Sequence, residues 1–189
     1  GHDALMMGYD FHLTADGPKL IEVNTNAGGG YIAWLSEAQA GGHDPINLTG
    51  RIQQRLLRTF HQEWRAFSGG KRRLQRLVLV DEEPQEQALY PEMVACRDWL
   101  RSEGIASEIA APEQLQAGAE GVFLNGDKVD LVYNRHCDFF LEDEAMAGLR
   151  QAYLAGAVCL SPNPFAYGLL ADKRRMILWS DQSALADLG

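Results

Sequence analysis

The pattern of apolar and polar residues predicts a hairpin followed by a long helix in the first part of the chain. Residues 6–14 and 19–26 are rich in β-forming residues, and turn-forming residues 15–18 separate them, so we expect a β-hairpin. Residues 31–35 are apolar and predict a short helix or loop, and residues 41–45 a chain break. An amphipathic helix is expected next, because apolar residues recur at helical spacing. They are Ile52, Leu56, Leu57, Phe60, Trp64 and Phe67.

From Leu77 onward the pattern alternates between strands and helices, which is typical of an α/β fold. Residues 77–80 are a short apolar run of the kind found in strands buried on both faces of a parallel sheet. The pair Asn125-Gly126 predicts a type I′ turn between strands at 122–124 and 128–133. Further strands are expected at 105–110 and 157–160, and helices at 91–102, 142–155 and 171–179.

We therefore predict an α/β protein with a mainly parallel, Rossmann-like sheet that has helices on both faces, preceded by a β-hairpin and a long helix. We divide the chain into three parts. Residues 1–72 contain the hairpin, a glycine-rich loop and the long helix, residues 73–166 form an α/β substrate-binding domain, and residues 167–189 carry a helix that returns to the first part.

Composition narrows the class of partner. The net charge of −9 argues against nucleic-acid binding, which needs a clustered positive field. No apolar run approaches the roughly 20 residues of a membrane span, so we expect no membrane partner. Three widely separated cysteines provide no disulfide framework, which favours a cytoplasmic location.

The strand that closes the hairpin carries the most informative polar residues. Glu22, Asn24 and Asn26 share one face, because side chains alternate along a strand. Glu22 and Asn24 lie about 7 Å apart along the backbone, and magnesium prefers such oxygen ligands together with substrate phosphates. Gly28 and Gly29 would let the backbone approach a bound phosphate, with Asn26 beside them. The alternative is a solvated strand face, and the spacing leaves both open.

Polar residues also follow the expected parallel strands, where ligands bind in open α/β sheets. Arg135 is the strongest candidate, since a guanidinium grips a carboxylate or phosphate with two hydrogen bonds. Asn134 and Asp138 are further substrate-side candidates. The alternative for Arg135 is a residue that caps a helix or pairs with Asp138 or Glu142 at the surface. Lys173 lies in a basic run that is either a solvated helix face or a phosphate-binding charge.

The sequence DFHLTADGPKLIEVNTNAGG (residues 10–29) resembles the strand pair of ATP-grasp ligases in which a Glu and an Asn bind magnesium. More specifically, it resembles the eukaryotic-type glutathione synthetase family. Residues 131–135 (LVYNR) and 171–174 (ADKR) are similar to a strand end and to a lysine-bearing helix of that family.

The resemblance implies an ATP-grasp core for residues 1–72 and 167–189, interrupted by an inserted substrate-binding domain. It also implies ATP and Mg²⁺ as cofactors. Glu22 and Asn24 would bind the metal, Lys173 would contact ATP, and Arg135 would contact the substrate. Asp10 matches an acidic residue on the partner strand.

The chain also departs from that family. Ala27 and Gly29 stand where the family has serines, Gly8 where it has an arginine, and Asp138 where it has a tyrosine. These changes affect the residues that meet the dipeptide substrate and leave the metal ligands in place. The acid and amine substrates therefore need not be those of glutathione synthesis.

The expected function is that of an ATP- and Mg²⁺-dependent carboxylate–amine ligase, which forms a peptide bond between small-molecule substrates through an acyl phosphate. The lid and further metal ligand of the family would lie beyond Gly189, so we expect the present chain to be inactive alone, with a homodimer among the assembly states open to it. The alternative is a non-catalytic ligand-binding or regulatory α/β module descended from such a ligase.

Overall fold

The computed structural model describes residues 4–39, 48–181, 183, 185 and 186. The break expected at residues 41–45 lies outside them. The central element is a four-stranded parallel sheet with the strand order β4-β3-β8-β9, which confirms the α/β class. Its strands are β3 (Arg76–Val80), β4 (Ala106–Ala110), β8 (Leu131–Asn134) and β9 (Cys159–Ser161).

The strand order reverses inside this sheet. β3 comes first along the chain but lies between β4 and β8. The chain leaves β3 on one side to form β4 and returns on the other side as β8. Ligands of open parallel sheets bind beyond the carboxyl ends of the strands at such a reversal. The loops that follow β3 and β8 are therefore the natural place for a site.

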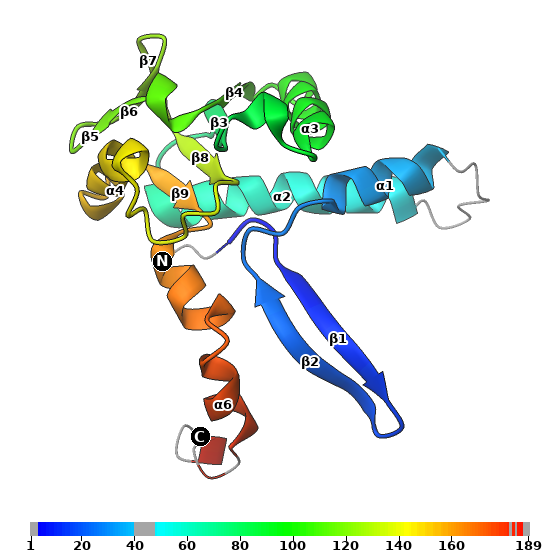
Figure 1. The fold of residues 1–189 in the computed structure, drawn as a ribbon. Coiled ribbons are helices and arrows are strands. Elements are labelled where there is room, and N and C mark those ends of the chain that lie inside the picture. The colour runs from blue at the N-terminus through cyan, green and yellow to red at the C-terminus, as the bar shows by residue number, and fades with distance from the viewer. Residues whose placement is uncertain (1–3, 40–47, 182, 184, 187–189) are drawn as a thin grey trace.

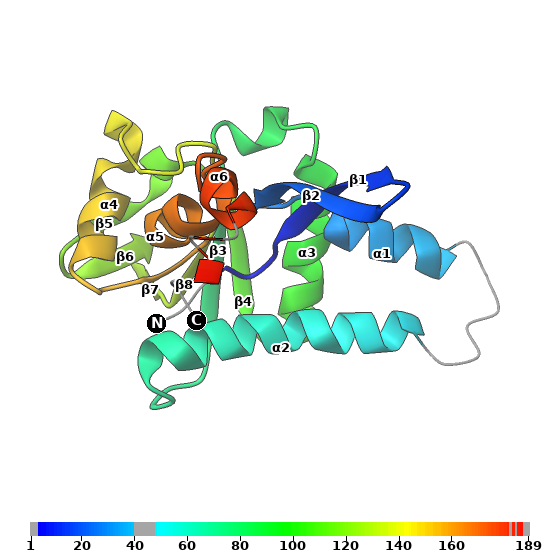
Figure 2. The same cartoon turned by 90° about the horizontal axis from the view of Figure 1, so that it is seen from below.

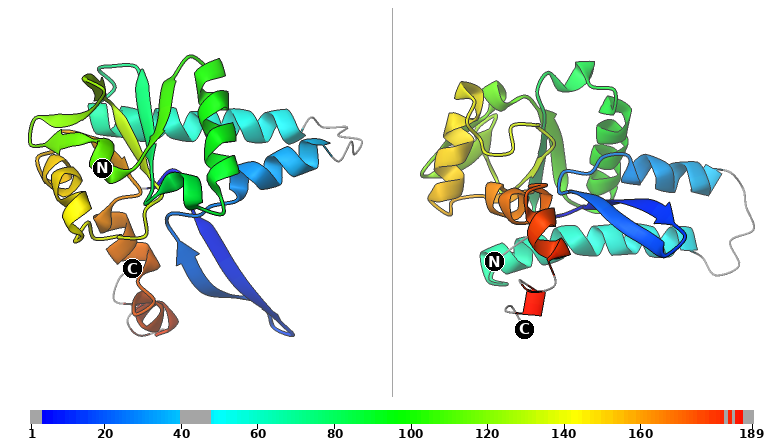
Figure 3. Two further views of the ribbon diagram at one scale, coloured as in Figure 1. Left: turned by 45° about the horizontal axis from the view of Figure 1, so that its top comes forward. Right: turned by 60° about the horizontal axis from the view of Figure 1, so that its bottom comes forward.

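Two helices, α2 (Leu48–Ser68) and α3 (Tyr90–Ser102), cover one face of the sheet, and α1 (Gly30–Gln39) packs against both of them (Figures 1 and 3). Leu77 and Leu79 of β3 belong to one buried cluster with Phe60 and Trp64 of α2 and Trp99 of α3. The apolar stripe predicted for the long helix is therefore the side that packs on the sheet.

A small antiparallel sheet and a helix cover the opposite face. The sheet contains β5 (Gln116–Gly118), β6 (Gly121–Leu124) and β7 (Asp127–Val129), and the helix is α4 (Ala147–Leu154). Val78 and Val80 of β3 are buried together with Val122 of β6 and Leu149 of α4. The apolar run at residues 77–80 is thus buried on both faces, as predicted.

The turn between β6 and β7 is the predicted Asn-Gly turn. Asn125 has φ 53° and Gly126 has φ 85°, and both central residues of a type I′ turn need positive φ.

The strand expected over residues 128–133 is wrong as a single hairpin arm, because it is divided between two sheets. β7 ends before Asp130 and β8 begins after it. The Asp130 carboxylate accepts hydrogen bonds from the amides of Gln75 and Arg76, at 2.9 and 3.1 Å. These bonds fix the crossing point at the start of β3, which the local pattern could not indicate.

Single-turn 3₁₀ helices stand at three connections. η1 (Pro84–Glu86) follows β3, η2 (Pro112–Gln114) follows β4, and η3 (Glu144–Met146) precedes α4. The helix expected over residues 142–155 is therefore η3 continued by α4.

The hairpin extends away from the α/β body (Figure 1). It contains β1 (Gly8–Thr14) and β2 (Gly17–Asn24), which confirms the prediction. The pairing shifts between Asp10–Glu22 and Phe11–Leu20, so Ile21 is the extra residue of a β-bulge.

The segment after β9 differs from the single helix expected over residues 171–179. It consists of α5 (Pro164–Ala166), a π-helical segment η4 (Tyr167–Ala171) and α6 (Arg175–Ser180). The carboxylate of Asp172 interrupts it by accepting hydrogen bonds from the amide and guanidinium of Arg174. These hydrogen bonds lower the pKa of Asp172 to about 2. Figures 1 and 2 place this segment beside β2.

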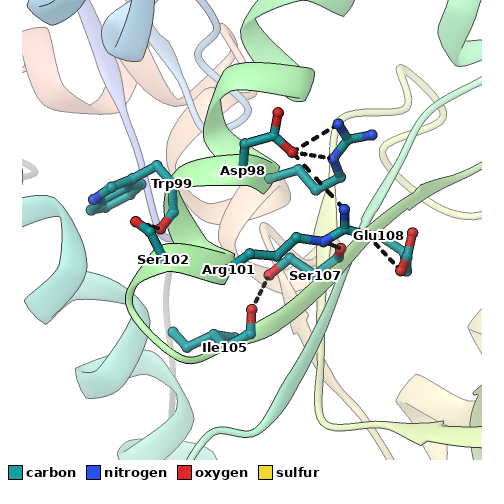
Figure 4. A network of polar contacts seen from close by, with 8 residues as sticks. Asp98, Trp99, Arg101, Ser102, Ile105, Ser107 and Glu108 are labelled. Carbon is teal, nitrogen blue, oxygen red and sulfur yellow. Dashed lines mark hydrogen bonds and ion pairs between the residues drawn. The ribbon is translucent and has the colours of Figure 1, made fainter.

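Polar contacts hold α3 against the edge strand β4 (Figure 4). The Arg101 guanidinium donates to the Ser107 carbonyl oxygen at 2.7 Å and to Glu108 Oε1 at 2.6 Å. The Ser107 hydroxyl donates to the Ile105 carbonyl oxygen at 2.9 Å.

None of the helices among the described residues is both long and apolar enough to cross a membrane.

Packing of α3 on the sheet is testable with one leucine pair. Leu100 is fully buried and Leu154 at the end of α4 is 76% exposed. Leu100→Ala should lower the free energy of unfolding by about 2–5 kcal/mol, because it leaves a cavity. Leu154→Ala, the matched control, should change it by less than about 0.5 kcal/mol. Equal losses in urea unfolding experiments would contradict this packing.

Candidate functional site

The polar face of the hairpin brings together three of the predicted residues. Asp10 lies directly opposite Glu22, and Asn24, two residues further along β2, lies opposite Gly8. Glu22 and Asn24 therefore share a face, as the strand alternation predicted. Two carboxylates directly opposite each other on a hairpin destabilise it through like-charge repulsion. This face therefore favours a bound cation.

Lys173 supplies one cation at this face. Its Nζ lies 3.1 Å from Glu22 Oε2. The Lys173 side chain is 68% exposed and that of Glu22 32% exposed, so the ion pair contributes little to stability, about 0–1 kcal/mol. The ion pair does show that the hairpin and the segment after η4 lie next to each other.

The oxygen atoms on this face suit a magnesium ion that also binds the phosphates of a substrate. Asp10 and Glu22 offer two carboxylates, and Asn24 offers an amide oxygen on the same face. Within the described part of the chain, no group of three or more His, Cys, Asp or Glu residues could hold a metal by itself. Magnesium is commonly bound by one or two carboxylates, with waters and substrate phosphates in the other positions. The residues present fit that arrangement.

Arg135 follows β8 and points to the loop between β2 and α1. Its amide donates to the Val80 carbonyl oxygen at 2.7 Å, which ties it to the end of β3. Its Nη1 donates to the carbonyl oxygens of Asn26 and Ala27, at 2.8 and 2.7 Å. Among the described residues it has no ion pair with a carboxylate. The surface pairing considered from the sequence is not observed.

Gly28 permits this close approach. A Cβ at this position would overlap Arg135 Nη2 and lie 2.5 Å from Leu89 Cδ1. The glycine is therefore needed for space at the guanidinium.

The amides at the start of α1 bind a carboxylate of the protein. Gly29 donates to Glu92 Oε2 at 2.8 Å, and Tyr31 donates to Glu92 Oε1 at 2.9 Å. Glu92 thus occupies the place where the positive end of a helix binds an anion. An external phosphate at the Gly29 amide would have to displace it.

Sequence reasoning did not single out Glu92. The available signal was an acidic residue in the first turn of α3. An acidic residue in the first turn is favourable in any helix, so its presence there did not indicate a contact with the distant glycine-rich loop.

The other two substrate-side candidates shape the loop after β8. The Asn134 Oδ1 atom accepts a hydrogen bond from the His136 amide at 3.2 Å. The Asp138 amide donates to His136 Nδ1 at 2.9 Å, and Asp138 Oδ2 accepts from the Asp143 amide at 2.8 Å. Both side chains hold backbone groups, so they set the path of this loop.

Asp81 directly follows β3 and lies near Arg135 and His136, and its buried side chain accepts a hydrogen bond from the Glu82 amide at 2.9 Å. Burial raises the pKa of the Asp81 carboxyl, although the Glu82 amide, Arg135 and His136 oppose that shift. Ionisation of Asp81 is therefore less favourable in the folded protein than in the unfolded chain.

Comparison with protein-family models finds no family that matches the chain, and comparison with curated proteins finds no match. The resemblance to ATP-grasp ligases rests on the motifs of the sequence.

We expect Gly28→Ala to destabilise the protein by about 1–3 kcal/mol, because the added methyl group has no room beside Arg135 and Leu89. Gly168→Ala is the control, since its Cβ would make only an ordinary contact with Phe140 at 3.7 Å. Chemical denaturation measures both variants. A Gly28→Ala protein as stable as the control would contradict the close approach.

The raised pKa of Asp81 predicts a pH-dependent effect of Asp81→Asn. A carboxyl whose folded pKa exceeds its unfolded value of about 3.9 favours folding when protonated. This stabilisation is complete below the unfolded pKa and is lost as the pH rises through the folded pKa. Asp81→Asn should therefore be more stable than the wild type near pH 7, and the two should converge below about pH 4. A difference that does not change with pH would contradict this assignment.

Proposed function

We propose that the chain carries the metal-binding hairpin and the substrate domain of an ATP- and Mg²⁺-dependent carboxylate–amine ligase. The observation that supports this proposal most strongly is the ion pair between Lys173 and Glu22. The resemblance assigns one residue to ATP and the other to the metal, and they are far apart in the sequence. Their proximity, with Asp10 opposite Glu22, is what a metal–nucleotide site requires.

Each side chain then has a role in binding. Glu22, Asn24 and Asp10 would hold magnesium, which when bound neutralises charge on the phosphate oxygens. Lys173, released from Glu22 by the metal, would act as a point charge on a phosphate. Arg135 would orient a substrate carboxylate through its guanidinium. Asn26, Gly28 and Gly29 would lie along the same ligand, and Asn134 and Asp138 would support Arg135 through the loop after β8.

A second candidate function is a non-catalytic ligand-binding or regulatory module. The observation in its favour is that protein groups already occupy two expected ligand contacts. Arg135 Nη1 binds the carbonyl oxygens of Asn26 and Ala27, and the Gly29 amide binds Glu92. Such internal contacts suit a loop with a purely structural role.

Nucleotide binding tests the metal site directly. Calorimetric titration with a non-hydrolysable ATP analogue should show binding that depends on Mg²⁺. Glu22→Gln should remove most of that dependence, and Lys173→Gln should weaken binding by roughly tenfold, about 1.4 kcal/mol. Lys71→Gln, which changes an exposed lysine, is the matched control. Binding that ignores magnesium and both variants would reject the proposed site.

Turnover separates the ligase from the binding module. ADP release by the full-length protein should require ATP, magnesium, an acid and an amine. It should fall at least about 100-fold in Glu22→Gln, which corresponds to about 2.7 kcal/mol of barrier. Magnesium-dependent nucleotide binding without ADP release over a broad panel of acids and amines would favour the non-catalytic module.

A further inference from the structure

Two charged side chains of the α/β body bind the backbone of the loop between β2 and α1, one through its carbonyl oxygens and the other through its amides. Arg135 donates to carbonyl oxygens of the first half of the loop, those of Asn26 and Ala27. Glu92 accepts from amides of the second half, those of Gly29 and Tyr31. The loop therefore connects a cation to an anion through its own peptide groups.

Glu92 is buried, with 5% of its surface exposed. In the described part of the chain it forms no ion pair with a basic side chain. Its hydrogen-bond partners are amides, including a longer contact of 3.4 Å from Ile32. A buried carboxylate that depends on amides holds them strongly, because losing them would leave its charge unsatisfied.

Glu92 and Arg135 also line one small cavity together with Tyr31, Cys96 and Tyr133. Its volume of about 10 Å³ is near the minimum for a single water molecule. Both charges act on Cys96: burial and Glu92 raise the pKa of its thiol and Arg135 lowers it, which together place it at about 12. The two side chains are therefore neighbours that bind the same loop.

We infer that Glu92 is a positioning residue for Arg135. By fixing the amides of Gly29 and Tyr31, Glu92 places the carbonyl oxygens of Asn26 and Ala27 where Arg135 Nη1 binds them. These two acceptors set the direction of the guanidinium. The inference deepens the proposed function and rests on it only in taking Arg135 as the group that meets the acid substrate.

The test uses two signals of the ligand-free protein. In Glu92→Gln, NMR should show the Arg135 Nε–H resonance shifted and broadened, and hydrogen exchange at the Gly29 and Tyr31 amides should rise at least about tenfold. Glu113→Gln, which changes an exposed glutamate of η2, should leave both signals unchanged. If Glu92→Gln does not fold, Glu92→Asp provides the same readouts with a shortened carboxylate.

Faster exchange at Gly29 with an unchanged Arg135 resonance would overturn the inference, because the loop would then be released without any consequence for the guanidinium. Unchanged exchange would overturn it as well. In an active ligase, Glu92→Gln should raise KM for the acid and leave KM for ATP unaltered. The NMR experiment requires neither nucleotide nor turnover, so absent Mg²⁺–ATP binding would reject the proposed function and leave the role of Glu92 to be decided separately.

Discussion

Burial of both faces of β3 is the constraint on which the rest of the structure depends. Leu77 and Leu79 face α2 and α3, while Val78 and Val80 face the small sheet and α4. A strand covered on both faces must be flanked by other strands, so that its backbone groups are hydrogen-bonded within the sheet. Its carboxyl end then lies beside that of β8, and Asp81 lies close enough to Arg135 and His136 for their charges to act on its carboxyl group.

The hairpin has a different physical character. It is a two-stranded sheet, which is marginally stable by itself in water, and it carries opposed carboxylates on its polar face. Repulsion between Asp10 and Glu22 makes a cation favourable there, and Lys173 lies within 3.1 Å of Glu22. The hairpin face therefore depends on the balance of charge between its side chains, whereas the α/β body depends on the burial of apolar side chains.

The loop between β2 and α1 joins these two parts. Its carbonyl groups are bound by a guanidinium and its amides by a carboxylate, both from the α/β body. A side chain larger than glycine at position 28 would clash with Arg135 and disrupt these contacts. A change in the position of this loop would therefore affect β2 on one side and Arg135 on the other.

The sequence by itself determined the elements whose physics is local. Hairpin, long helix, Asn-Gly turn and the buried strand at residues 77–80 all follow from alternation, helical spacing or turn chemistry, and the shared face of Glu22 and Asn24 follows from strand geometry. Only the tertiary structure decided which distant groups meet. The division of residues 128–133 at Asp130, the contact of Lys173 with Glu22 and the capture of the loop by Glu92 and Arg135 each depend on segments that are remote in the chain. No local periodicity carries such information, because these contacts form only when the packed sheet brings the segments together.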